Sequence, residues 1–197
     1  MKRENCKILV IGAGPGGYVC AIRAGQLGLD TIVVEASTPG GTCLNVGCIP
    51  SKALIHAAEE FHIAAHFAGE NDLGISTTKP SIDLAKTVAW KDGIVKRLTG
   101  GVSALMKKAK VRSISGHAQI IDGKTVDVDT PEGTVRISTE NLVIATGSRP
   151  QEIATLPFGG DILSSTAALS LDSVPERLAA DTSALRSEPP WPNWVPK

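Results

Sequence analysis

The sequence lacks a net charge, because its twenty lysines and arginines balance twenty aspartates and glutamates. Without an excess of one sign, nothing in the charge pattern predicts binding to nucleic acid or to an anionic membrane surface. The sequence also lacks an apolar run of about 18 residues, which argues against a transmembrane helix. The residues after Met1 lead directly into a strand-like run with no separate apolar region or cleavage site. We therefore predict no signal peptide and a cytoplasmic protein.

Cysteine is scarce, and its distribution narrows the roles that it can have. Of the four cysteines, Cys6 and Cys20 stand in apolar, core-like contexts, and only Cys43 and Cys48 are close together. Zinc sites usually combine two closely spaced ligand pairs, and a second pair is missing from this sequence. One close pair and two isolated thiols favour a cytosolic redox protein over a secreted disulfide scaffold.

The spacing of Cys43 and Cys48 predicts a break in the helix between them if they form a disulfide. A disulfide needs Cα atoms within about 7 Å, whereas residues five apart on a regular helix lie about 8–9 Å apart. Because proline fits only the first turn of a helix, we expect irregular backbone over residues 43–47 and a helix from about Pro50. A helix N-terminus favours a thiolate, so a redox-active pair is our preferred interpretation. Two buried free thiols or half of a metal site are the alternatives.

The first 35 residues have the pattern of a dinucleotide-binding unit. An apolar strand is expected at residues 7–11. It is followed by glycines 12, 14 and 17 at G-x-G-x-x-G spacing, by a helix at 18–27 and by a second strand at 31–35. In this pattern Gly12 makes the tight turn, Gly14 admits a pyrophosphate, and Gly17 lets the helix pack closely on the strand. Glu35 ends the second strand and is placed to accept hydrogen bonds from a ribose. The alternative is a glycine-rich turn in another kind of α/β protein.

The rest of the chain adds helices and then short strands. We expect helices at 53–68 and from a cap at 81–83 to about 110, and strands at 111–114, 118–121, 125–129, 134–137 and 142–145. Turn residues separate the short strands, as in a β-meander. We expect the last strand to return to the sheet that begins near Ile8. The small residues after that strand, Thr146, Gly147 and Ser148, would let the backbone approach a cofactor.

With these pieces assembled, residues 5–178 resemble the flavoprotein disulfide reductases, the class I pyridine nucleotide-disulfide oxidoreductases. The most specific segment is residues 40–52, GGTCLNVGCIPSK. Residues 49–55 favour the dihydrolipoyl dehydrogenase branch over glutathione reductase, and a mercuric-reductase-like enzyme or a non-catalytic FAD-binding remnant is the alternative. The resemblance implies an α/β fold over 5–178: a Rossmann-like FAD-binding domain with a parallel sheet, βαβ units and a small antiparallel meander.

The resemblance also implies roles for individual residues. Cys43 would be the outer thiol that exchanges with a substrate disulfide, and Cys48 would lie against the flavin and exchange electrons with it. Lys52 would lie near the flavin N5, and Ala118 would belong to a segment whose backbone contacts the adenine. The other FAD-binding residues would be Gly12, Gly14, Gly17, Glu35, Gly41, Thr42, Cys43, Thr146, Gly147 and Ser148.

The reaction implied by the resemblance passes electrons from dihydrolipoamide through the cysteine pair and FAD to NAD. The implied partners are an acyltransferase of a 2-oxoacid dehydrogenase complex, which carries the dihydrolipoamide, and a second copy of the chain in a homodimer. No nucleic acid, membrane or bound metal is implied. In the family, a base for thiol exchange comes from an interface domain, and an NAD domain follows the FAD-binding part.

The last residues, 179–197, do not continue this pattern and are rich in proline. Codons can be chosen for them so that the neighbouring reading frame spells a second G-x-G-x-x-G, which leads to the hypothesis of a frameshift near residue 178. A naturally divergent, irregular tail is the alternative. With the NAD and interface domains missing, we expect exposed apolar surface, weak FAD binding and no NAD-dependent turnover by this chain alone.

Overall fold

The computed structural model describes residues 1–177, so the predicted irregular tail at 179–197 lies outside the described residues. Its strands are β1 (Lys2–Ile11), β2 (Thr31–Glu35), β3 (Arg112–Ser115), β4 (His117–Asp122), β5 (Thr125–Thr130) and β6 (Gly133–Ile144). Its helices are α1 (Pro15–Gln26), α2 (Gly41–Asn45), α3 (Cys48–Phe67), α4 (Leu84–Lys108) and α5 (Ser165–Ala168). Within this part of the chain, no helix has both the length and the apolar character needed to cross a membrane.

The strands form one six-stranded sheet in the order β3-β2-β1-β6-β5-β4. Parallel pairs join β1 to β2 and β6, and β2 to β3. The pairs β4–β5 and β5–β6 are antiparallel and make the meander. The prediction of an α/β fold with a parallel sheet and a small antiparallel meander is therefore confirmed.

Strand β2 and the second half of β1 are buried on both faces, as their continuous apolar sequences predict. Leu9 and Val10 are consecutive on β1, fully buried, and belong to two different core clusters. The first cluster lies between the parallel sheet and the meander and includes Leu9, Ile32, Val34, Val126, Val128 and Ile137. The second lies between the sheet and helices α1 and α4 and includes Val10, Ala21, Val33, Val102 and Met106. Each large aliphatic side chain buried in this way contributes about 1.5–3 kcal/mol.

Strand β6 differs from the sequence prediction, which placed two separate strands at 134–137 and 142–145. The structure has one strand, Gly133–Ile144, that pairs with β5 in its first half and with β1 along most of its length. The polar residues between the two apolar runs obscured this continuity. Thr139 is buried, and its hydroxyl donates to the Asn141 carbonyl oxygen at 3.0 Å, which satisfies it within the sheet. The same pairing extends β1 back to Lys2, five residues before its predicted start.

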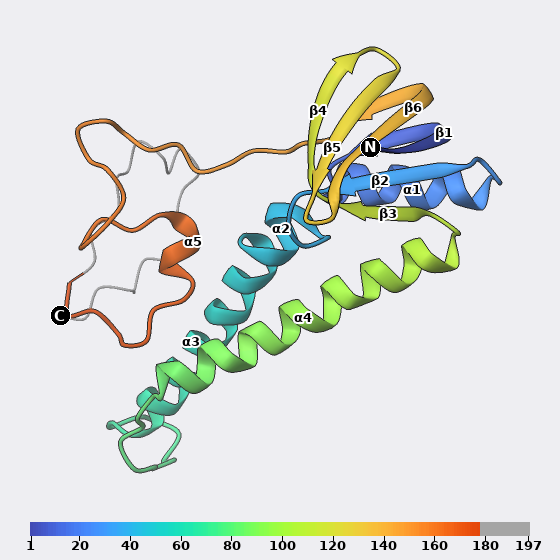
Figure 1. The fold of residues 1–197 in the computed structure, drawn as a ribbon. Helices are drawn as coiled ribbons and strands as arrows, with labels where there is room; N and C mark the ends of the chain where they lie inside the picture. Colours follow the sequence, from blue (N-terminus) through green and yellow to red (C-terminus); the bar gives the residue numbers. More distant parts are fainter. Residues whose placement is uncertain (178–197) are drawn as a thin grey trace.

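The helices largely follow the prediction. Helix α1 begins at Pro15, earlier than the predicted residue 18, because the fixed φ of proline suits the first helical position. The carboxylate of Asp83 caps α4 by accepting from the backbone N–H of Lys86, and α4 continues unbroken through its two consecutive glycines. Figure 1 shows α3 and α4 as a pair that extends from the sheet, with the segment after β6 beside them.

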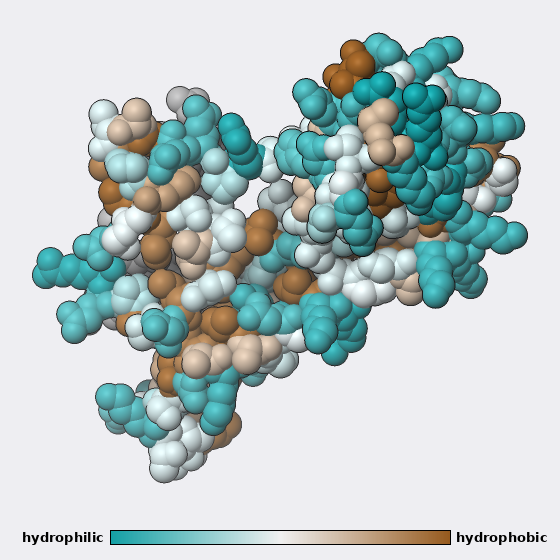
Figure 2. Space-filling view, viewed as in Figure 1, coloured by the Kyte–Doolittle hydropathy of each residue, from teal (hydrophilic) through white to brown (hydrophobic). Residues whose placement is uncertain are grey.

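Apolar side chains are exposed, as predicted, and the structure places several of them on the helical pair and on the segment that follows β6. Figure 2 shows hydrophobic residues gathered over these parts, while the meander surface is mainly hydrophilic. The large exposed side chains include Trp90, Leu98, Leu105, Ile144, Ile153, Leu156 and Phe158.

Candidate functional site

The predicted cofactor residues meet where β1, β2 and β6 end. The turn after β1 has Gly12 at φ +99°, and a Cβ on this residue would overlap the Ala145 carbonyl oxygen at the end of β6. A Cβ on Gly17 would overlap the Gly12 carbonyl oxygen, so this glycine permits the close approach of α1. A Cβ on Gly14, by contrast, would make one ordinary contact, 3.6 Å from the Gly41 Cα. The open side of Gly14, at the N-cap of α1, is the feature that a bound pyrophosphate requires.

The carboxylate of Glu35 lies against this glycine turn. It accepts from the backbone N–H of Ala13 at 2.7 Å and from the N–H of Ser37 at 3.0 Å. The Glu35 carbonyl oxygen accepts from the N–H of Gly116 at 3.0 Å, which places the start of β4, with Ala118, beside the end of β2. The structure thus brings the predicted ribose-binding and adenine-contacting residues to the same place.

The residues after β6 complete the edge of this site. The N–H of Ala145 donates to the Ile11 carbonyl oxygen at 2.8 Å, which holds the end of β6 to the end of β1. Thr146, Gly147 and Ser148 follow directly and are exposed, and Gly147 has φ +70°. The predicted second cofactor turn therefore lies next to the first glycine turn.

The redox segment packs directly on the glycine turn. The N–H of Gly40 donates to the Ala13 carbonyl oxygen at 2.7 Å. Gly41 has φ +60°, and a Cβ on it would lie 2.6 Å from the Gly14 Cα. The two glycine motifs therefore touch backbone to backbone, and a larger residue at Gly41 would separate them.

The cysteines lie on either side of a break between two helices. Cys43 is in the five-residue α2, and Cys48 is the first residue of α3. The prediction of irregular backbone is confirmed at Val46 and Gly47. It is wrong for residues 43–45, which are helical, because one break is enough to bring the end of α2 and the start of α3 together. A Cβ on Gly47 would lie 2.8 Å from the Thr42 carbonyl oxygen, so a glycine is needed there. Pro50 is buried in the first turn of α3, as predicted.

The two cysteines are free thiols in the structure, and Cys48 lies close enough to Cys43 to affect the ionisation of Cys43. The pKa of Cys43 is raised, first by its hydrogen bond with the Cys48 thiol and then by burial, while the positive charge of Lys52 acts in the opposite direction. Cys43 is half-buried, and Cys48 and Lys52 are exposed. The predicted catalytic residues and Lys52 are thus gathered at the junction of α2 and α3.

Sequence reasoning assigned no role to Asn45, the last residue of α2. Its side-chain amide donates toward the carbonyl oxygens of Thr38, Pro39 and Gly41 at 3.2, 3.3 and 3.0 Å. An asparagine four residues after a glycine pair was the available signal. The hydrogen bonds join residues that the sequence pattern treats as separate.

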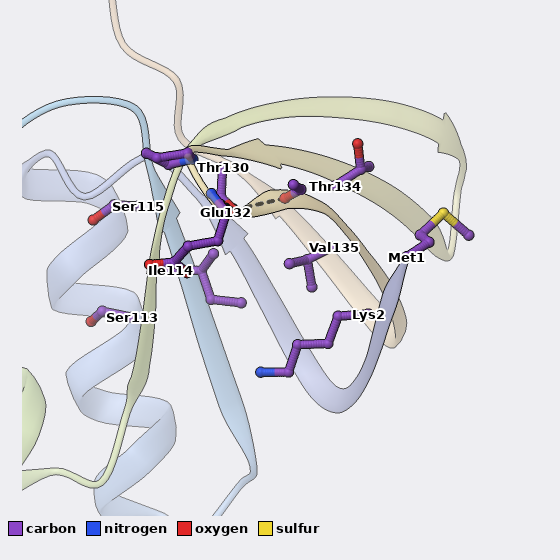
Figure 3. A pocket seen from close by; sticks show the side chains of 11 residues that line it. Met1, Lys2, Ser113, Ile114, Ser115, Thr130, Glu132, Thr134 and Val135 are labelled. Carbon is purple, nitrogen blue, oxygen red and sulfur yellow. Dashed lines mark hydrogen bonds between the residues drawn. The ribbon is translucent and has the colours of Figure 1, made fainter.

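A pocket of about 500 Å³ lies apart from the predicted site residues, between the start of β1, strand β3 and the β5–β6 turn. Figure 3 shows Lys2 and Val135 on one side of it and Ser113 and Ser115 on the other. None of the predicted cofactor or cysteine residues lines this pocket.

Comparisons with known proteins find similar sequences. The dihydrolipoyl dehydrogenase of Pseudomonas aeruginosa is 57% identical over 172 residues, which cover 87% of this chain and 37% of that protein. The dihydrolipoyl dehydrogenase of Geobacillus stearothermophilus is 48% identical over 170 residues, covering 86% of this chain and 36% of that protein. The chain thus spans little more than a third of the length of these curated relatives.

A solved structure with the same fold is the Cu(II) complex of the HOCl-induced flavoprotein disulfide reductase RclA from Escherichia coli. It matches with a TM-score of 0.69 and 25% sequence identity, over 88% of this chain and 36% of that chain. The model of the pyridine nucleotide-disulphide oxidoreductase family matches residues 6–180. With the glycine turn, Glu35 and the cysteine pair gathered at one edge of the sheet, the chain belongs to the pyridine nucleotide-disulphide oxidoreductase family.

Proposed function

We propose that the chain is the FAD-binding part of a dihydrolipoyl dehydrogenase-type oxidoreductase, in which Cys43 and Cys48 alternate between dithiol and disulfide. The observation that carries this proposal is the contact between Gly41 and Gly14, which joins the redox segment to the nucleotide-binding turn. The names of the curated relatives support this substrate class over a mercuric reductase.

The described residues fit FAD. Gly14 leaves its side of the turn open to a pyrophosphate, and no side chain caps the N-terminus of α1, so its backbone N–H groups are available to an anion. The Glu35 carboxylate lies at the end of β2, where a ribose would be held. Bound FAD would supply two-electron chemistry, accepting an electron pair from a dithiol and passing it to NAD.

The cysteine pair would carry out the exchange with the substrate. A thiolate of dihydrolipoamide attacks the Cys43 sulfur, the Cys43–Cys48 bond breaks, and Cys48 leaves as a thiolate. The second substrate thiol, after losing its proton, displaces Cys43 and closes the substrate disulfide. The substrate has then lost two electrons and two protons, and the cysteine pair holds the two electrons. The positive charge of Lys52 favours the thiolate of Cys43 at this stage.

The exposure of Cys48 supports its assignment to the flavin side. Its side chain is open in the structure, whereas Cys43 is half-buried. An open thiol at the start of α3 leaves space for a flat ring to pack against it. The dihydrolipoamide would be carried by an acyltransferase of a 2-oxoacid dehydrogenase complex, and the functional unit would be a homodimer, as the resemblance implies.

The proposal is tested by adding FAD to the full chain and titrating it without oxygen with dihydrolipoamide. We expect a long-wavelength absorbance band from contact between a thiolate and the flavin. Cys48→Ser should remove the band, whereas Cys43→Ser should retain a band because Cys48 is still present. Alkylation followed by mass spectrometry should show a Cys43–Cys48 disulfide in the oxidised chain.

Three outcomes would contradict parts of the proposal. A band lost in Cys43→Ser and kept in Cys48→Ser would reverse the roles of the two cysteines. FAD binding without any reduction of the disulfide would indicate a non-catalytic FAD-binding protein. A wild-type chain that binds no FAD under conditions where it is folded would refute the cofactor assignment.

A further inference from the structure

Asn45 has an unusual set of hydrogen bonds for a side chain at the end of a short helix. Its amide nitrogen has two hydrogens and faces three backbone carbonyl oxygens at 3.0–3.3 Å. Two of these carbonyls, those of Thr38 and Pro39, lie in the connection from β2, and the third, that of Gly41, starts α2. The side chain therefore ties the end of α2 to the backbone that leads into it.

The same backbone is fixed to the nucleotide-binding turn. Gly40 lies between the carbonyls that Asn45 contacts, and its N–H donates to the Ala13 carbonyl oxygen. Gly41 packs against Gly14 with no space for a side chain. Cys43 is two residues from Asn45 in the same short helix. A continuous set of contacts therefore runs from the glycine turn through Asn45 to the helix that carries Cys43.

We propose that Asn45 is a positioning residue for the Cys43–Cys48 redox couple. The inference rests on the proposed function, because it assigns to Asn45 the placement of a thiol that takes part in that reaction. Asn45 touches neither thiol in its hydrogen bonds, and it acts through the position of α2.

The reason lies in the narrow geometry of a disulfide. The bond forms only when the two Cα and Cβ positions are close to fixed values. A braced α2 holds Cys43 at the break before α3, so little freedom is lost when the bond closes. Without the amide donors, the reduced segment would gain freedom that disulfide formation must remove again. The hydrogen bonds are present while both thiols are reduced, so their loss shifts the disulfide equilibrium only by the ordering that they supply, which for two ordinary hydrogen bonds is at most about 30-fold.

The test compares the disulfide equilibrium in variants of the full chain, first without FAD. Asn45→Asp keeps the shape and replaces the donors by a carboxylate that faces three carbonyl oxygens. Asn45→Ser keeps a smaller group in case the first variant does not fold. Asn71→Asp is the matched control, because the Asn71 amide also donates to two backbone carbonyls, those of Gly69 and Ile75, but in the loop after α3.

Each protein is equilibrated with mixtures of oxidised and reduced glutathione, and the Cys43–Cys48 disulfide is quantified by alkylation and mass spectrometry. In the reaction, one glutathione disulfide is reduced to two glutathione thiols for each protein disulfide formed. We expect the equilibrium constant to fall in both Asn45 variants, by up to about 30-fold, and to be unchanged in Asn71→Asp. Thermal unfolding of each variant separates a redox effect from a general loss of stability.

The outcomes distinguish this inference from the proposed function. If the wild-type chain forms no Cys43–Cys48 disulfide, the proposed function fails. If the wild type forms it and folded Asn45 variants have the same equilibrium constant, the positioning role is overturned and the proposed function stands. If neither Asn45 variant folds, Asn45 serves the fold in general and the positioning role is likewise overturned.

Discussion

The contact between Gly41 and Gly14 allows a sharp prediction for Gly41→Ala. An added Cβ would lie 2.6 Å from the Gly14 Cα, whereas ordinary van der Waals contact begins at 3.4 Å. The neighbouring atom is backbone in a turn held by several hydrogen bonds, so it cannot rotate away as a side chain would. We expect α2 to move away from the glycine turn by nearly 1 Å, taking Cys43 with it.

The magnitude has two parts that a control can separate. Gly41 has φ +60°, and an alanine in this left-handed region costs about 1–2 kcal/mol. Overpacking against a fixed neighbour adds about 1–3 kcal/mol. Gly28 is the matched control, because it also has positive φ, +78°, but a Cβ there would meet nothing within 4 Å. We therefore expect a loss of about 2–5 kcal/mol for Gly41→Ala and about 1–2 kcal/mol for Gly28→Ala.

Urea unfolding followed by circular dichroism measures the free energy of unfolding of both variants, and a fluorescence titration measures their affinity for FAD. Gly41→Ala should lose FAD affinity beyond its effect on stability, because the contact lies at the proposed pyrophosphate site. Gly28→Ala should keep the affinity of the wild type. Equal losses of stability in the two variants, with equal FAD affinity, would refute the argument from close packing.

Three further predictions concern ionisation and one buried side chain. Cys48→Ala should lower the pKa of Cys43, because the Cys48 thiol is the main cause that raises it, so alkylation of Cys43 by iodoacetamide should begin at lower pH. The hydrogen bond and positive charge of Arg136 lower the pKa of Asp127 in the folded state. The ion pair therefore stabilises the fold at pH values above the ordinary aspartate pKa, and this contribution is lost as the pH falls through the lowered pKa of Asp127. Asp127→Asn should therefore show a smaller loss of unfolding free energy between neutral and acidic pH than the wild type in urea titrations. The buried Lys91 ammonium donates to the Leu169 carbonyl oxygen, directly after α5, at 2.8 Å. Lys91→Met should therefore release the segment around α5, and limited proteolysis should detect faster cleavage there without a change in the sheet.

Local patterns in the sequence predict much of the fold. The apolar run of β1, the glycine turn and β2 each follow from neighbouring residues, so their type and order are correct. The register between distant strands does not follow from neighbours. Ser138, Thr139, Glu140 and Asn141 look like a connection, yet they lie within β6 because β1 supplies hydrogen-bond partners more than 100 residues away. Packing of the meander over the parallel sheet is likewise set by long-range burial.

The placement of the candidate site in the fold was predictable to a similar degree, and the roles of its residues stay predictions. The residue types indicated cofactor and redox roles, because glycines at G-x-G-x-x-G spacing, a glutamate at the end of the second strand and a close pair of cysteines each suit a specific chemistry. Their mutual placement depends on contacts between segments, as in the Gly116 N–H that donates to the Glu35 carbonyl oxygen. Asn45 was missed for the same reason, because its hydrogen bonds reach back into the connection before α2, and its position four residues after a glycine pair was the only local signal.

The direct contact between the two glycine motifs limits how the distance between cofactor and cysteines can change. Gly14 and Gly41 meet through Cα atoms, and Gly40 adds a backbone hydrogen bond to Ala13, so no side chain in this contact can be exchanged to adjust the spacing. Thr42 and Lys52, by contrast, are exposed beside the pair and can vary without disturbing the contact. Backbone packing therefore fixes where α2 meets the nucleotide turn, and the Asn45 hydrogen bonds hold Cys43 within it, while the pKa of Cys43 is open to adjustment by the charges around it. A change of substrate within this architecture would be expected in the exposed side chains first, with the two glycine motifs retained.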